Sequence, residues 1–149
     1  MKYYQFFVLG LFILVSCQKS KEDDPLLAMK TKLSKSWRIS SIYALEPQSW
    51  AGIRLTGGCA DLNIWTFGEG GQFRLTEDSS CYNYPSEYLG IWKFVNKDSL
   101  VIEYTRGSSS DRNFRIAKLT DDTLKLQMPT IILDSLYTPG VNEYTFIPK

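Results

Sequence analysis

The strongest constraint on the fold of this chain is a series of short segments in which apolar and polar residues alternate, most of them separated by turn residues. Alternation with a period of two is typical of β-strands that bury one face. Eight segments show it: residues 37–45, 62–67, 73–78, 88–95, 99–104, 113–119, 123–128 and 143–148. Aromatic residues make up 14% of the chain, which also suits half-buried strands. The sequence therefore predicts an all-β domain.

A glycine-rich turn, residues 68–71, joins the second and third of these segments and predicts a hairpin. If Phe67 lies opposite Phe73, the same register places Trp65 opposite Leu75. The large apolar side chains then share one face of the hairpin, and we expect that face to point into the core.

Eight strands with mostly local connections fit an up-and-down antiparallel barrel, because closing the sheet removes its exposed edges. A barrel of this size holds its own side chains or one small ligand. A two-sheet sandwich is the alternative, since periodicity does not distinguish a closed sheet from an open one. A second turn, residues 96–98, places Trp92 opposite Ile102. A short helix before the first strand is also expected, with Asp24 as N-cap and Pro25 at its first position.

The start of the chain has a different character from the strands. Lys2 precedes an unbroken apolar run over residues 6–15, followed by Ser16 and Cys17. A helix over that run covers about 15 Å, half of a hydrocarbon core of about 30 Å, so it is too short for a membrane span. A basic start, a short apolar centre and a small residue before the processing point are typical of a secretory signal. Residues 14–17, Leu-Val-Ser-Cys, resemble the lipobox of bacterial lipoproteins.

In that family the cysteine sulfur receives a diacylglycerol, the peptide is cut before the cysteine, and the new N-terminus is usually acylated, for example with palmitate. The resemblance implies a signal peptide at residues 1–16, a lipidated Cys17 in a charged flexible tether over residues 17–25, and a barrel domain over residues 26–149. Two or more acyl chains hold a protein stably on a membrane. The alternative is an ordinary cleaved signal with an incidental cysteine.

Three acidic residues, Glu22 to Asp24, follow Cys17 after a short spacer. This cluster resembles the export signal of lipoproteins in Bacteroidetes-type bacteria, and a plain solvated spacer is the alternative. The resemblance implies a location in the bacterial cell envelope, at the outer membrane, on its periplasmic or surface-exposed face.

The cysteine count agrees with lipidation of Cys17. The chain has three cysteines, and lipidation leaves Cys59 and Cys81 as a pair. The register that places Phe67 opposite Phe73 brings Cys59 opposite Cys81, within disulfide range. We predict a disulfide that closes the base of this hairpin and contributes about 3 kcal/mol to stability. Two separate buried thiols are the alternative.

A second resemblance extends over most of residues 33–147. Its motifs are LSKSWRI around Trp37, Cys59-Ala60-Asp61, Trp65-Thr66-Phe67, Gly90-Ile91-Trp92 and Leu119-Thr120-Asp121-Asp122-Thr123-Leu124. Together they resemble the lipocalin-like domain of small bacterial lipoproteins. The resemblance implies that Trp37 closes the narrow end of the barrel, although Lys35 and Ser36 replace the familiar Gly-x before it. Members of this family generally hold small hydrophobic molecules.

The residues offer little for catalysis. The chain has no histidine, the usual acid–base group and metal ligand at neutral pH. The glycine-rich turn joins two strands and does not open a helix, so it predicts no phosphate site. A net charge of +1 gives no attraction to nucleic acid. We therefore expect no enzyme activity, no cofactor, no metal and no nucleic-acid partner.

Binding of a small hydrophobic ligand is the favoured function, and the strand registers nominate residues that line the barrel. The candidates are Trp65, Phe67, Phe73, Trp92, Tyr104 and Arg115. Arg115 is proposed as an inward cation for a carboxylate, but the turn at residues 121–122 allows either register and leaves its direction open. The alternative is that the aromatic residues form a packed core and that Arg115 lies outside.

The alternative function is a surface module that binds or inhibits a protein, in which a solid barrel displays contacting loops. The connections 46–60 and 129–140 are rich in apolar residues, among them Trp50 and Ile53. These loops would form the contact surface. They are equally suited to act as lids over the barrel.

Overall fold

The computed structural model describes residues 24–55, 58–80, 86–106, 110–131 and 139–149. The predicted signal, Cys17, most of the tether and Cys81 lie outside these residues. None of the described helices has the length and apolar character needed to cross a membrane.

The first element is the predicted helix, α1 (Pro25–Leu33). The side chain of Asp24 accepts a hydrogen bond of 2.9 Å from the Leu26 N–H, which satisfies one of the unpaired donors of the first turn. Pro25 occupies the first position, where its missing N–H costs nothing. Leu33 is fully buried and Met29 packs on the core, so the last turn of α1 is part of the barrel's packing.

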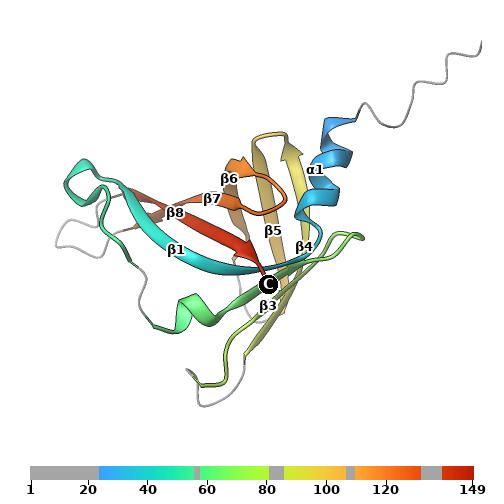
Figure 1. The fold of residues 1–149 in the computed structure, drawn as a ribbon, viewed down its shortest axis with the longest axis horizontal. Helices are drawn as coiled ribbons and strands as arrows, with labels where there is room; N and C mark the ends of the chain where they lie inside the picture. Colours follow the sequence, from blue (N-terminus) through green and yellow to red (C-terminus); the bar gives the residue numbers. More distant parts are fainter. Residues whose placement is uncertain (1–23, 56–57, 81–85, 107–109, 132–138) are drawn as a thin grey trace, which may run out of the picture.

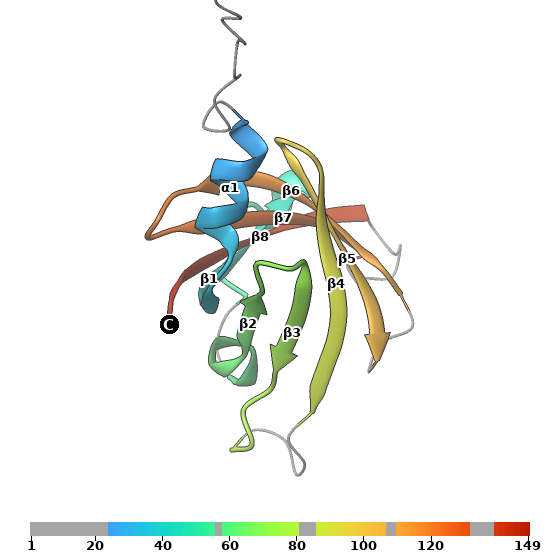
Figure 2. The same cartoon turned by 90° about the vertical axis from the view of Figure 1, so that its right-hand side faces the viewer.

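Within the described residues eight strands follow the helix. They are β1 (Ser36–Glu46), β2 (Ile64–Phe67), β3 (Gln72–Thr76), β4 (Glu87–Asn96), β5 (Ser99–Arg106), β6 (Arg112–Leu119), β7 (Leu124–Ile131) and β8 (Pro139–Pro148). Each strand pairs antiparallel with the next, and β8 pairs with β1. The predicted eight-stranded up-and-down barrel is confirmed, and its closure excludes the sandwich. In Figures 1 and 2, β7 and β8 cross β4 and β5 at a steep angle around a common core.

The predicted hairpin registers are also confirmed. Phe67 lies opposite Phe73, and Trp92 lies opposite Ile102. The ladder between β2 and β3 stops at Ile64, because residues 59–62 form a 3-10 helix, η3 (Cys59–Leu62). The register argument therefore does not reach Cys59, and its pairing with Cys81 stays a prediction.

The end of the barrel at which β1 begins, called the closed end here, is sealed around Trp37. This side chain is fully buried, and its indole N–H donates to the Leu33 carbonyl at 2.9 Å. The ammonium of Lys35 lies 5.2 Å from the centroid of the Trp37 ring and donates to the Asp121 carbonyl at 3.0 Å. These contacts tie α1, β1 and the turn between β6 and β7 together.

Candidate functional site

Four of the six predicted ligand-binding residues form a packed aromatic cluster. Trp65, Phe67, Phe73 and Trp92 are each at most 6% exposed. Trp65 makes edge-to-face contacts with three rings, those of Phe73, Phe114 and Phe146, with centroids 5.5, 5.8 and 5.2 Å away. At these positions the barrel interior is filled by side chains.

Trp92 links this cluster to the closed end. Its ring contacts Phe67 with centroids 5.8 Å apart, and its indole N–H donates to the Gly68 carbonyl at 3.0 Å. The indole N–H of Trp92 therefore already has a hydrogen-bond acceptor within the protein. A ligand would have to displace well-packed rings to reach this part of the interior.

The opposite end of the barrel, where β4, β6 and β8 begin, carries polar groups on the inner side of the sheet. Arg112 begins β6 and lies opposite Ile102, which is fully buried. Directly opposed residues in a sheet point to the same face, so Arg112 lies on the inner face of the sheet together with Phe114, at the rim of the barrel where its side chain is exposed to solvent. We call this end the loop end.

The only hydrogen bond of the Arg112 guanidinium within the described residues goes to the sulfur of Met128, at 3.6 Å. A thioether is a weak acceptor. No described carboxylate forms an ion pair with Arg112. The guanidinium thus keeps most of its donors available on the inner side of the loop end.

Two tyrosines lie near this cation, and a third contacts one of them. Burial raises the pKa of the Tyr104 and Tyr144 hydroxyls, and the nearby charge of Arg112 opposes that shift. The Tyr104 ring stands edge-on to Phe73 at 5.7 Å and to Tyr88 at 6.3 Å. We name Tyr88, Tyr104, Arg112 and Tyr144 the loop-end cluster.

The loop-end cluster lies directly on the aromatic core. Tyr144 stacks on Phe146 with centroids 6.4 Å apart, and Phe146 is one of the rings that hold Trp65. Of the six predicted ligand-binding residues, Tyr104 is the one that belongs to the cluster. It is only partly buried, unlike the aromatic residues below it.

Asn63 adds a second polar group in the loop-end half of the barrel. It precedes β2, follows the alternation of the inward residues Trp65 and Phe67, and is 8% exposed. Its side-chain oxygen has no hydrogen-bond partner among the described residues. This oxygen is an acceptor on the inner side of the loop end.

Arg115 does not point into the barrel. Its side chain is exposed, on the face of β6 opposite to Phe114. The cause is a bulge between Ile116 and Lys118 in the pairing of β6 with β7, which reverses the faces of all residues before it. The inward cation of β6 is Arg112. The sequence held a signal for this, because Arg112 shares its alternation with Phe114 and Ile116, two apolar residues of that strand.

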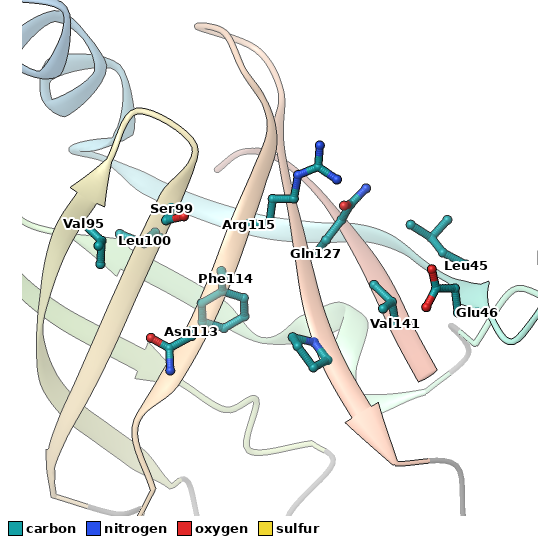
Figure 3. A pocket seen from close by; sticks show the side chains of 11 residues that line it. Leu45, Glu46, Val95, Ser99, Leu100, Asn113, Phe114, Arg115, Gln127 and Val141 are labelled. Atoms are coloured by element: carbon teal, nitrogen blue, oxygen red, sulfur yellow. The ribbon is translucent and has the colours of Figure 1, made fainter. Parts of the chain in front are cut away.

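Arg115 instead lines a pocket of about 590 Å³ on the outer face of the barrel, which we call the outer pocket. In Figure 3 the side chains of Arg115 and Gln127 lie next to each other, with Val141 and Glu46 farther along the pocket. Asn113 and Pro129 also contribute to its walls. The residues of the loop-end cluster do not line the outer pocket.

Acidic side chains do not gather into a metal site in the described part of the chain. No group of three or more His, Cys, Asp or Glu residues with suitable geometry occurs there.

Comparison of the sequence with protein-family models and with curated proteins gives no match. The fold is similar to that of a lipocalin-like protein from Bacteroides uniformis ATCC 8492, with a TM-score of 0.54, 10% identity, and coverage of 79% of this chain and 99% of that chain. A deswapped triple mutant of bovine odorant binding protein gives a TM-score of 0.46 and 14% identity, covering 79% of this chain and 74% of that one. The first likeness is one of fold, and it agrees with the lipocalin-like barrel predicted from the sequence.

Proposed function

We propose that this protein is a lipid-anchored lipoprotein of the bacterial outer membrane that binds a small hydrophobic molecule bearing an acidic group, without catalysing a reaction. The observation that carries the proposed binding is Arg112, an inward guanidinium at the loop end whose partner among the described residues is a thioether. Guanidinium groups pair with carboxylates through two parallel hydrogen bonds.

The surroundings of Arg112 suit such a ligand. The hydroxyls of Tyr104 and Tyr144 are protonated at neutral pH, as expected for tyrosines with an ordinary pKa of about 10, which burial raises further here, so both are hydrogen-bond donors. The tyrosine rings supply apolar contact area next to these donors. The ligand's acidic group would lie against Arg112, and its apolar body would lie against Tyr88, Tyr104 and Tyr144.

The first test is the loss of binding when Arg112 is neutralised. We expect decanoate, kept below its micelle concentration, to shift the backbone amide resonances of Tyr104 and Tyr144. The Arg112→Gln variant should bind at this site about tenfold more weakly or worse, since a hydrogen bond to a charged group contributes about 1.5–3 kcal/mol. The measurement is a nuclear magnetic resonance titration that follows these two amides.

The matched control is Arg38→Gln, because Arg38 is an exposed arginine on the outer side of β1. This variant should leave the titration unchanged. Equal affinity of Arg112→Gln and the unaltered protein would contradict the loop-end site. Absence of any response at Tyr104 and Tyr144 would favour the interaction module, for which Trp50 and Ile53, 38% and 46% exposed, are available contact residues.

The anchor is supported by the sequence around Cys17, which resembles a lipobox. We expect the protein expressed in a Gram-negative host to fractionate with the outer membrane and to carry a mass increase from acyl chains. The Cys17→Ser variant should lose both, because no other cysteine occupies the processing position. Cys59→Ser is the matched control and should stay in the membrane fraction. Membrane association of Cys17→Ser equal to that of the unaltered chain would overturn the anchor.

Export through the envelope also supports the predicted disulfide between Cys59 and Cys81, since disulfides form and persist in oxidising compartments. We propose the disulfide together with the lipid anchor, because both require export from the cytoplasm. It would hold the connection between β3 and β4 to η3 beside the loop end.

A further inference from the structure

We propose that the outer pocket is a second binding site, specific for a small amphiphilic anion whose acidic head pairs with Arg115 and whose apolar body lies along Pro129 and Val141. This site lies on the opposite face of the sheet from the loop-end cluster. It does not depend on ligand binding at the loop end.

A row of polar residues crosses the outer face through Arg115. Pairing between neighbouring strands places Ser99 opposite Arg115, Arg115 opposite Gln127, and Gln127 opposite Glu143. The carboxylate of Glu143 is therefore two strands away from Arg115. It is the acid of this row that would be expected to balance the charge of Arg115.

Glu143 is already engaged by other groups. The Lys125 ammonium donates to one of its oxygens at 2.7 Å, and the Gln127 amide donates to the other at 2.9 Å. Burial acts to raise the pKa of Glu143, but these two hydrogen bonds and the charge of Lys125 outweigh it and lower the pKa. Glu143 thus stays ionised and paired with Lys125.

Arg115 consequently has an unbalanced charge. The outward Lys93 and Arg74 pair with Glu103 and Glu87, but no described acid forms an ion pair with Arg115. Its guanidinium lines a pocket, so an incoming anion would meet a cation that is already positioned beside apolar walls.

The charges at the two ends of the outer pocket determine which way round the ligand is expected to bind. Glu46 lies at the β1 side of the pocket, three strands from Arg115, which is about 14 Å across the strands at about 4.8 Å per strand, and is also displaced by two residues along them. An acidic head is attracted to Arg115 and repelled by Glu46. The apolar side chains of Pro129 and Val141 lie between these two charges, as Figure 3 shows for Val141.

The size and the polar lining agree with a small molecule. A volume of about 590 Å³ falls within the range of about 300–1,000 Å³ typical of small-molecule sites. Ser99 and Asn113 flank Arg115 on the same face and provide further donors for the oxygens of a carboxylate. A neutral alcohol of the same length would lose the attraction between opposite charges and the paired hydrogen bonds that a carboxylate makes with a guanidinium.

The experiment is a nuclear magnetic resonance titration of the mature chain with decanoate and, separately, with decanol. Decanoate is expected to shift the backbone amides of Ser99 and Gln127, and decanol should do so at least several times more weakly. Arg115→Gln should weaken decanoate binding at these amides about tenfold, because it removes hydrogen bonds from a charged donor. Glu46→Gln is the matched control and should retain the binding or strengthen it.

The two sites are distinguished within the same titration. Arg115→Gln should leave the response of Tyr104 and Tyr144 unchanged, and Arg112→Gln should leave the response of Ser99 and Gln127 unchanged. A response at Tyr104 and Tyr144 without one at Ser99 and Gln127 would overturn the outer site and leave the proposed function standing. Equal binding of decanoate and decanol at the outer amides would likewise overturn the specificity for an anion.

Discussion

Replacing Trp37 with alanine is expected to lower the free energy of unfolding by about 4 kcal/mol, within the range of about 3–5 kcal/mol for buried tryptophans. The side chain is fully buried at the closed end, so its removal leaves a cavity that the rigid barrel cannot fill. The substitution also deprives the Leu33 carbonyl of its hydrogen bond from the indole N–H. The measurement is urea unfolding followed by far-ultraviolet circular dichroism.

The matched control is Trp50→Ala, because Trp50 is 38% exposed in the connection after β1. Its substitution should change the free energy of unfolding by less than about 1 kcal/mol. Trp37→Phe separates the two contributions, since it retains an aromatic ring and removes the indole donor. A loss below about 1 kcal/mol for Trp37→Ala would show that the closed end does not depend on this side chain.

Gly90→Ala is the substitution with the second largest expected effect, a loss of about 3 kcal/mol at the upper end of the range for overpacking. A Cβ atom at position 90 would lie 2.5 Å from the Glu103 carbonyl oxygen and 3.3 Å from the Tyr104 Cα. Both atoms belong to the backbone of β5, which cannot move away without breaking its pairing with β4. Thermal and urea unfolding of the variant would measure the loss.

Gly70→Ala provides the control for this substitution. A Cβ atom at position 70 would meet only the flexible side chain of Gln72, which is exposed and able to move aside. We expect a change below about 1 kcal/mol there. Similar losses at both positions would mean that the close approach of β4 and β5 at Gly90 does not determine the effect of the extra methyl group.

The hairpins show how far the sequence determines the fold. Phe67 and Phe73, and likewise Trp92 and Ile102, flank short turns. The turn fixes the register, and the alternation on both strands then places the large apolar side chains on one face. The helix could also be predicted from the sequence, because Asp24 as N-cap and Pro25 at the first position mark where it starts. Such features depend on neighbours in the sequence, and this is why they could be predicted.

Which arginine of β6 faces inward could not be predicted from local patterns in the sequence. Counting backward by twos from Leu119, which packs on the core, makes Arg115 an inward residue. The bulge between Ile116 and Lys118 shifts this count by one, so that Arg112 points inward instead. A bulge is set by how two strands fit together in space, so the alternation of Arg112, Phe114 and Ile116 and the count from Leu119 give opposite directions, and the sequence alone does not decide between them. Tyr88 and Tyr104 belong to a hairpin that the sequence predicts, but Tyr144 comes from β8, which is distant in the sequence, so its place beside Arg112 could not be predicted from local patterns.

The first and last strands of the barrel pair with each other at the closed end. The last residue, Lys149, donates its backbone N–H to the Ser36 carbonyl at 3.1 Å, so β8 ends where β1 begins (Figures 1 and 2). The chain therefore enters and leaves the barrel on one side. A tag, a fused protein or a sensor surface attached through either terminus would leave the loop end exposed to solution. A short linker from Lys149 to α1 would also permit a circular permutant opened at one of the loop-end connections.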